Sequence, residues 1–393
     1  MIIKKIALSL LLASTMVSAM AQKPLVNVKK EFAFATKQYE NMLASHPDIR
    51  KFPQSTKKDG SPDNRTSEWW CSGFFGGSLW YLYEFTGEDK WKTAADKWTK
   101  ALDKEKYNTR THDLGFMLYC PYGNGYRLTK NKDYIEPMVT GANSLATRFD
   151  PKYGVIKSWD KHADCEYPVI IDNMMNLEFL FWAAKESKNN KLRDIAITHA
   201  DNTLKHHFRD DFSSYHVVCY LPGTKVFRKK THQGAADSSA WARGQAWALY
   251  GYTMMYRETK NKKYLAQAEG IAKFVINHPN MPKDKVPYWD FDAPKIPNEE
   301  RDASAAAIFA SSLLELSTFT KAENKKLYFS TAEQMLVSLA SPAYTAKLNE
   351  NNNFILKHSV GHKPGNSEIN TPLVYADYYY LEALLRYKKL TKQ

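Results

Sequence analysis

A repeated helical hairpin is the feature that most constrains how this chain can fold. At five places an apolar segment with helical period is followed by a short turn rich in Lys, Asn and Glu, after which an aromatic residue or Leu opens a second amphipathic segment. The residues that close the five turns are Trp91, Tyr134, Leu192, Tyr264 and Leu327. Their spacing is unequal, which indicates a helix-hairpin repeat with insertions of different lengths.

The pattern predicts about twelve helices. One stands alone near residues 26–46, five hairpins follow, and a last helix stands alone near 372–388. The hairpins are expected at 73–87/89–104, 113–129/132–149, 172–187/190–206, 239–258/262–278 and 303–319/324–339. If six hairpins close into a ring, the first lone helix pairs with the last, which explains why one is left at each end.

The insertions decide between two helical architectures. An open solenoid of the tetratricopeptide kind has repeats of nearly constant length. Unequal repeats with long inserts favour an all-α (α/α)6 toroid, in which the loops on one face build a site. We therefore expect a single catalytic domain over residues 22–393, although the length alone would allow two or three domains.

Composition and charge narrow the function classes. The chain is 44% hydrophobic with 17 Gly and 17 Pro, which excludes collagen-like and largely disordered proteins. Its net charge of +13 favours anionic partners, but the lysines are scattered over the turns and form no basic arm, so no nucleic-acid partner is expected. Aromatic residues make up 13% of the chain, and flat rings suit either the stacking of sugars or simply a bulky helical core.

The N-terminal segment has the form of a secretory signal. Lys4 and Lys5 precede an apolar run and a small-residue cleavage pattern, so residues 1–21 are expected to be removed before Gln22. We expect a periplasmic protein without a membrane span, because no later stretch is long and apolar enough. Export would permit disulfides, but the wide spacing favours four buried free thiols, at Cys71, Cys120, Cys165 and Cys219.

The N-termini of the predicted inner helices should meet on one face. The first helix of each pair is the more apolar, which marks it as inner, and parallel inner helices would all start at the same end of the ring. Polar and aromatic residues occupy these starts, at 69–74, 112–113, 172–173, 237–243, 301–302 and 370–371. Free backbone N–H groups at helix N-termini also favour an anionic ligand.

Two acidic residues stand at equivalent places in neighbouring repeats. Asp113 and Asp172 each open a predicted inner helix, so their carboxylates can face one another across a substrate. Acidic residues at helix starts are also ordinary caps with no further role. Asp172 differs because apolar residues flank it on both sides, and desolvation there should raise its pKa and make it a proton donor.

A second cluster combines indoles with a guanidinium group. Trp241 and Trp247 flank Arg243, an arrangement that suits a carboxylated sugar held by a bidentate fork and by stacking, or equally a core helix with a buried ion pair. The histidines show no metal-ligand spacing such as H-E-x-x-H, so no metal site is predicted.

Three ordered blocks resemble a known family. They are HDLGFM at 112–117, IDNMMNL at 171–177 and WARGQAW at 241–247. They are similar to the signature blocks of the unsaturated glucuronyl hydrolases, glycoside hydrolase family 88, and the likeness extends from about residue 65 to 385. Members of that family have the (α/α)6 fold and remove the 4,5-unsaturated uronic acid from the non-reducing end of lyase-generated glycosaminoglycan fragments.

The resemblance implies a role for each matching residue. Asp172 is implied to be the catalytic acid and base, with Asp113 as the second essential carboxylate. The residues implied to bind the unsaturated sugar are His112, His216, Gln233, Trp241, Arg243 and Trp247, with Trp69 or Trp70 and Trp159 lining the pocket. The stretch at 359–367 does not match the Ser/Lys pattern that contacts sulfate in some members, so the preferred sulfation and glycosaminoglycan stay open, as does the oligomeric state.

The expected reaction is hydration of the C4=C5 double bond. Asp172 would protonate C4, water would add to C5, and the hemiketal would open to release the next sugar, with no metal or organic cofactor required. Two alternatives remain: an unsaturated rhamnogalacturonyl hydrolase of family 105 acting on pectin fragments, and a non-catalytic periplasmic oligosaccharide-binding protein. The His112-Asp113 pair favours the glucuronyl enzyme, because family 105 more often has two acids there.

Overall fold

The computed structural model describes residues 24–393, so the expected signal at 1–21 lies outside the described residues. Twelve α-helices form in this part of the chain. Their bounds are α1 (Val28–Ser45), α2 (Ser72–Thr86), α3 (Asp89–Lys100), α4 (Asn124–Thr129), α5 (Ile135–Ala146), α6 (Leu177–Ser187), α7 (Asn190–His206), α8 (Ala242–Thr259), α9 (Lys262–Asn277), α10 (Ala303–Ser317), α11 (Ala322–Leu339) and α12 (Val374–Thr391).

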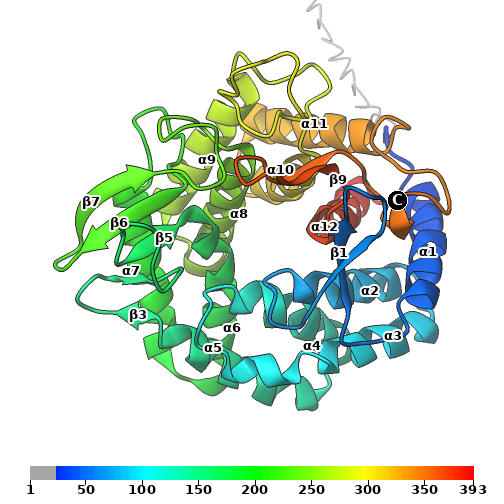
Figure 1. Cartoon of the computed structure of the whole chain (residues 1–393), viewed down its shortest axis with the longest axis horizontal. Coiled ribbons are helices and arrows are strands. Elements are labelled where there is room, and N and C mark those ends of the chain that lie inside the picture. The colour runs from blue at the N-terminus through cyan, green and yellow to red at the C-terminus, as the bar shows by residue number, and fades with distance from the viewer. Residues whose placement is uncertain (1–23) are drawn as a thin grey trace, which may run out of the picture.

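The helices form two concentric layers of a closed ring (Figure 1). The inner layer consists of α2, the π-helix η2 (Gly115–Gly123) with α4, then α6, α8, α10 and α12. Except at Glu315, every residue of α10 is buried, as expected for a helix covered on all sides. The predicted (α/α)6 toroid is therefore confirmed.

The first helix closes the ring against the last, as the hairpin pattern predicted. Phe32 of α1 stacks on Phe85 of α2 with ring centroids 4.0 Å apart. The Tyr39 hydroxyl of α1 donates to the Asp377 carboxylate of α12 over 3.3 Å. The second contact joins residues 338 positions apart in the sequence, so α1 links the two ends of the ring.

The repeated Lys-Asn turns have a local physical cause. Lys130, Lys188 and Lys260 each end an inner helix in the left-handed conformation, with φ of 58°, 56° and 56°. The next residue is Asn in all three turns, and its side chain accepts a hydrogen bond from the backbone N–H two residues further on. An αL residue stops one helix and the Asn cap starts the next, so the turn is fixed by local sequence.

The second predicted hairpin is less regular than its periodicity suggested. Its inner helix is split into η2 and α4, and its outer helix begins with a short 3-10 turn, η3 (Lys132–Tyr134), before α5. The inner helix that was expected to start at Asp172 also begins with a 3-10 segment, η4 (Ile171–Asn176). Short irregular turns of this kind often occur where functional side chains are positioned.

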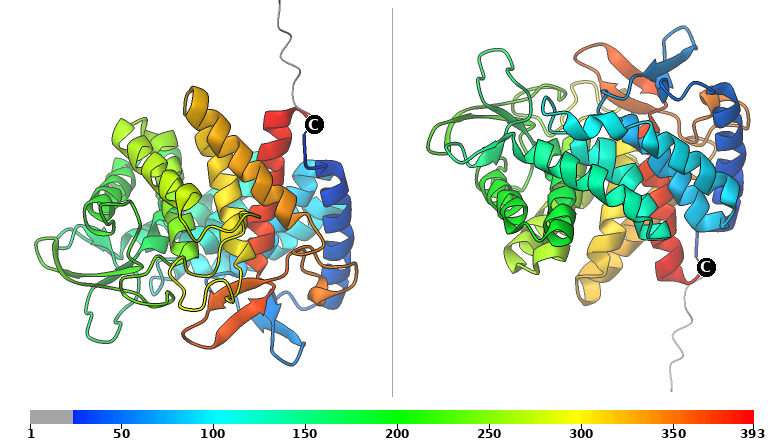
Figure 2. Two further views of the ribbon diagram at one scale, coloured as in Figure 1. Left: turned by 90° about the horizontal axis from the view of Figure 1, so that it is seen from above. Right: turned by 90° about the horizontal axis from the view of Figure 1, so that it is seen from below.

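Nine short strands, which helical periodicity did not predict, lie in the connections of the described chain. They are β1 (Phe52–Thr56), β2 (Pro62–Arg65), β3 (Phe149–Asp150), β4 (Val155–Ile156), β5 (Pro168–Ile170), β6 (Val217–Leu221), β7 (Lys225–Lys230), β8 (Ser359–His362) and β9 (Ser367–Thr371). All pairings are antiparallel, and β6 lies between β5 and β7. Figure 2 shows hairpins β1–β2 and β8–β9 together at one end of the ring, where the inner helices start.

A disulfide corrects the expectation of four free thiols. Cys165 and Cys219 are bonded, with their Cα atoms 5.5 Å apart. Pairing of β5 with β6 brings the loop before β5 against Cys219, which the sequence separation of 54 residues conceals. Cys71 and Cys120 are free and buried, as expected. Within residues 24–393, no helix is both long enough and apolar enough to cross a bilayer.

Candidate active site

Asp172 lies in the first turn of η4, where β5 delivers the chain to the start of the inner helix α6. It is 7% exposed, and its Oδ2 atom is buried without a hydrogen-bond partner. Burial raises the pKa of Asp172 to about 7, the nearby Arg243 opposes the shift, and Asp113 adds to it by like-charge repulsion. A carboxyl group with this pKa is protonated for a large part of the time near neutral pH and can act as a general acid.

His216 presents a hydrogen-bond donor to that carboxyl group. Its Nδ1 accepts from the backbone N–H groups of His232 and Gln233 at 3.2 and 3.1 Å, so the neutral ring carries its proton on Nε2. Nε2 lies 3.7 Å from Oδ2 of Asp172. Burial lowers the pKa of His216 well below its ordinary value, which keeps the ring neutral. The imidazole can therefore stabilise the carboxylate that forms when Asp172 gives up its proton.

Asp113 is held at the same end of the ring by two neighbours in sequence. The Thr111 hydroxyl donates to its Oδ2 over 3.0 Å, and Nε2 of His112 lies 3.2 Å from its Oδ1. His112 donates from Nδ1 to the Ser158 carbonyl over 2.9 Å, so its neutral form faces Asp113 with a lone pair. Burial lowers the pKa of His112, and the neighbouring Asp113 opposes that shift.

Arg243, in the first turn of α8, is fully enclosed. It is 1% exposed and pairs with Asp302 over 3.3 Å. Its Nη1 also donates to the Val360 carbonyl and its Nη2 to the Gly361 carbonyl over 2.7 Å, and Gln233 donates to the same Gly361 oxygen over 2.9 Å. The guanidinium group thus ties hairpin β8–β9 to the site. Its Nε is buried without a hydrogen-bond partner.

Stacked aromatic rings support the guanidinium group. Trp241 and Tyr375 lie under it at 4.5 and 5.3 Å from their ring centroids. Trp247 packs against Phe116 at 5.2 Å, and Phe116 packs against Trp70 at 5.5 Å. Trp70 is therefore packed in the same aromatic cluster as Trp247.

Trp69 is turned outward. It is 39% exposed and stacks on Arg65 at 4.8 Å. Of the two indoles, Trp70 packs among the aromatic rings beside Arg243, whereas Trp69 packs on Arg65. Arg65 is the neighbour of this exposed indole.

Three histidines that the sequence did not single out form a cluster at Trp159, where two of them contact the indole and the third, His362, packs on His232. The rings of His162 and His232 lie 5.0 and 5.2 Å from it, and their Nε2 and Nδ1 atoms approach to 3.1 Å. His362 of hairpin β8–β9 donates to the His232 carbonyl over 3.0 Å. Burial lowers the pKa of each of the three. The position of His232 beside Gln233 was the only sequence signal for this cluster.

The expected site residues therefore converge at the inner-helix N-termini, with the single exception of Trp69. Tyr375 and Asp302 belong to the site as well, and their positions at the starts of α12 and α10 were the signal that could have identified them. Among the described residues, no group of three or more His, Cys, Asp or Glu is arranged to hold a metal ion.

A toroid of helical hairpins with two carboxyl groups at one end is compatible with acid–base chemistry on a sugar, and comparison with known proteins identifies the class as the glycoside hydrolases. Residues 45–389 match the model of Glycosyl Hydrolase Family 88. The chain belongs to this family.

Curated relatives cover most of the chain. It is 46% identical over 368 residues to an unsaturated glucuronyl hydrolase of Formosa agariphila, covering 93% of this chain and 91% of that protein. It is 34% identical to an unsaturated chondroitin disaccharide hydrolase of Streptococcus pyogenes, covering 86% of both. A crystal structure of an unsaturated glucuronyl hydrolase specific for heparin is 51% identical, with a TM-score of 0.90 and coverage of 93% of this chain and 98% of that one.

Proposed function

We propose that this enzyme removes the 4,5-unsaturated uronic acid from the non-reducing end of lyase-generated glycosaminoglycan oligosaccharides. The observation that carries the proposal is Asp172, a buried carboxyl group with a pKa raised to about 7 and an Oδ2 that no protein donor satisfies. The relatives support the substrate class, since they are named for unsaturated glucuronyl and chondroitin disaccharide substrates rather than for pectin fragments.

The chemistry begins with protonation. Asp172 donates its proton to C4, the C4=C5 electron pair forms the new C–H bond, and the positive charge at C5 is shared by the ring oxygen. Nε2–H of His216, 3.7 Å from Oδ2, faces the carboxylate that remains. The negative charge on Asp172 in turn stabilises the cation at C5.

Water then adds to C5. The same carboxylate takes a proton from this water as the C–O bond forms, which restores the acid and leaves a hemiketal at C5. The hemiketal opens as the bond between C5 and the ring oxygen breaks, which gives a ketone at C5 and a hemiacetal at C1. Collapse of that hemiacetal to an aldehyde breaks the glycosidic bond and releases the next sugar. Asp113 would hold ring hydroxyls, and its charge favours the protonated form of Asp172.

Heparin fragments are the first substrates to test. The heparin-specific structure shares 51% identity with this chain, whereas the chondroitin disaccharide hydrolase shares 34%. In hairpin β8–β9, His362 and Lys363 stand where the Ser/Lys pattern was sought, and both side chains are engaged by the protein itself. We therefore expect recognition of the second sugar to differ from that of members that carry that pattern.

The decisive experiment follows the ultraviolet absorbance of the conjugated double bond in a panel of unsaturated disaccharides. Heparin-type and chondroitin-type substrates should lose absorbance, and rhamnogalacturonan products should not. In heavy-oxygen water the label should enter C5 of the released uronate, and deuterium oxide should leave deuterium at C4. Label on the anomeric oxygen, or cleavage of the saturated disaccharide, would instead show a conventional two-carboxylate glycosidase.

We also propose export to the periplasm, with cleavage before Gln22. The Cys165–Cys219 disulfide supports it, because such bonds persist in oxidising compartments. N-terminal sequencing of protein recovered from the periplasm of a Gram-negative host should begin at Gln22. Recovery of uncleaved protein from the cytoplasm alone would contradict export.

A further inference from the structure

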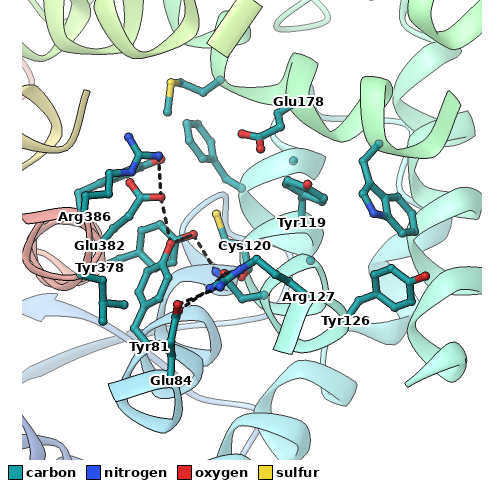
Figure 3. Close-up of a pocket in the computed structure, with 18 of the residues that line it drawn as sticks. Tyr81, Glu84, Tyr119, Cys120, Tyr126, Arg127, Glu178, Tyr378, Glu382 and Arg386 are labelled. Atoms are coloured by element: carbon teal, nitrogen blue, oxygen red, sulfur yellow. Dashed lines mark hydrogen bonds and ion pairs between the residues drawn. The ribbon is translucent and has the colours of Figure 1, made fainter. Parts of the chain in front are cut away.

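A second cavity opens at the end of the ring opposite the candidate active site, where the inner helices finish. Its volume is about 480 Å³, and α2, η2, α4, α6, α8 and α12 all contribute to its lining (Figure 3). Gly115, Phe116 and Met175, from the first turns of their helices, line its inner end. Phe116 also packs against Trp247 of the active site at 5.2 Å. Phe116 thus touches both this cavity and the candidate active site, and none of the proposed catalytic or sugar-binding residues lines the cavity.

One wall of this cavity is aromatic and partly uncovered. Trp182 of α6 packs against Tyr119 and Tyr126, with ring centroids 6.2 and 5.6 Å apart. All three side chains are only half-buried, although they belong to inner helices whose other apolar residues are mostly covered. Figure 3 shows Tyr119 and Tyr126 on the side of the cavity away from α12. Exposed ring faces of this kind suit the apolar face of a pyranose.

The opposite wall is polar and rigid. The Glu382 carboxylate accepts hydrogen bonds from the hydroxyls of Tyr81 at 3.1 Å, Tyr250 at 3.0 Å and Ser311 at 2.5 Å. Arg386 adds an ion pair at 3.3 Å. The hydrogen-bonding groups are therefore held in place before any ligand arrives, which lowers the entropic cost of binding. The Tyr81 hydroxyl, which donates to Glu382, can still accept a hydrogen bond from a ligand hydroxyl.

The charge of the mouth is unbalanced. Glu84 pairs with Arg127 at 2.5 Å, and Glu178 pairs with Arg257 at 2.6 Å. Lys130 and Lys389 also line the cavity, and neither has a carboxylate within 4.0 Å among the described residues. Both are exposed, and the lining as a whole holds four cationic side chains against three carboxylates, which leaves one positive charge in excess. Such a surplus attracts an anionic ligand.

We propose that this cavity is a second ligand site that binds an acidic saccharide, namely a pyranose that bears a carboxylate or a sulfate. The ring would stack on the wall formed by Tyr119, Tyr126 and Trp182. Its hydroxyls would face the Glu382 network, and its acidic group would lie toward Lys130 and Lys389. The inference does not depend on the function proposed for Asp172.

The test uses wild-type protein labelled with 5-fluorotryptophan and followed by fluorine NMR. Trp182→Phe identifies the Trp182 resonance by its disappearance. D-glucuronate and N-acetylglucosamine 6-sulfate should each shift that resonance saturably, with a dissociation constant on the order of 1 mM, and uncharged N-acetylglucosamine should bind several-fold more weakly. The two acids separate carboxylate from sulfate recognition. A Trp182 resonance that none of the three sugars moves would overturn the proposal.

A charge-removal pair tests the role of the lysines. Lys130→Gln with Lys389→Gln should weaken binding of both acids several-fold and leave the neutral sugar unaffected. The matched control, Lys273→Gln with Lys325→Gln, removes two exposed lysines elsewhere and should change nothing. The control variant should still bind the acidic sugars more tightly than the neutral sugar. Equal binding of acidic and neutral sugars in the control variant, as well as in the Lys130 and Lys389 variant, would refute the acidic ligand. The resonances of Trp241 and Trp247 report the active site separately, so failure of one proposal is distinguishable from failure of the other.

Discussion

At the scale of single residues, two buried aspartates differ in their hydrogen bonds, and this difference distinguishes a structural carboxyl group from a candidate catalytic one. Burial raises the pKa of both Asp172 and Asp377 to about 7. Asp377 accepts hydrogen bonds from the backbone N–H groups of Ile355 and Leu356 and from Tyr39, so its oxygens are occupied by the fold. Oδ2 of Asp172 has no such partner, and Nε2 of His216 lies 3.7 Å from it.

Asp172→Asn should abolish turnover and leave the fold intact. The amide cannot deliver a proton to C4, so the rate of absorbance loss should fall by several powers of ten. Asp113→Asn should also lose several powers of ten, because it disturbs both the substrate hydroxyls and the pKa of Asp172. Far-ultraviolet circular dichroism serves as the fold control. An Asp172→Asn variant that keeps activity near wild type would disprove the assignment.

The stability of the same variant should depend on pH in a defined direction. The pKa of Asp172 is raised in the folded state, so ionisation destabilises the folded protein progressively between about pH 4 and pH 7. Asp172→Asn avoids this cost. It should be more stable than wild type by roughly 2–4 kcal/mol at pH 8 and by under about 1 kcal/mol at pH 4, measured by urea unfolding. Asp377 contributes equally to the pH dependence of both proteins, so its contribution cancels in the comparison. A stability difference between the two proteins that does not vary with pH would refute the raised pKa of Asp172.

At the scale of elements, the active site is assembled by hairpins that dock onto helix starts. Arg243 of α8 holds hairpin β8–β9 through the carbonyls of Val360 and Gly361. The sheet β5–β6–β7 carries His216 toward Asp172, and β5 leads directly into η4. The strands therefore position candidate site residues such as His216, and the helices form the scaffold to which the strands attach.

Arg243→Lys should weaken substrate binding by roughly 1–3 kcal/mol. Lysine keeps the charge but cannot satisfy two carbonyls and Asp302 while presenting a further donor to the uronate. The expected readout is a raised KM for the charged disaccharide, together with faster hydrogen exchange in hairpin β8–β9. Unchanged values of both would show that the guanidinium fork is dispensable.

The disulfide should stabilise the sheet that carries His216. Replacing both Cys165 and Cys219 by Ser removes a covalent loop closure across 54 residues, which should lower the free energy of unfolding by about 2–4 kcal/mol. A reductant should bring wild type to the stability of the double variant and leave the variant unchanged. If reductant destabilises wild type and the double variant equally, the disulfide is not the cause of the difference in stability between them.

At the scale of the whole molecule, stability depends on closure of the ring by α1. Phe32→Ala removes a fully buried ring that stacks on Phe85, and such a change typically costs about 3–5 kcal/mol. Because α1 joins both α2 and α12, loss of helical circular dichroism and the shift in tryptophan fluorescence should still coincide. A separate early transition confined to part of the helix signal would show that α1 unfolds independently of the ring.

The pattern of the sequence was enough to predict the helices, their pairing and the toroid. Those features depend on local causes: the helical period of apolar residues, and turns in which an αL Lys is followed by an Asn cap, as at Lys130 and Asn131. It also placed Asp113 and Asp172 at one end of the ring, because parallel inner helices must start together.

The contacts between groups at that end depend on the tertiary structure. The Cys165–Cys219 bond, the packing of Trp70 on Phe116, the proton position on His216 and the docking of Val360 on Arg243 all join segments that are remote in sequence or depend on which way a side chain turns. No local periodicity encodes such contacts, since strand pairing and side-chain packing are selected by the burial that the completed ring makes possible.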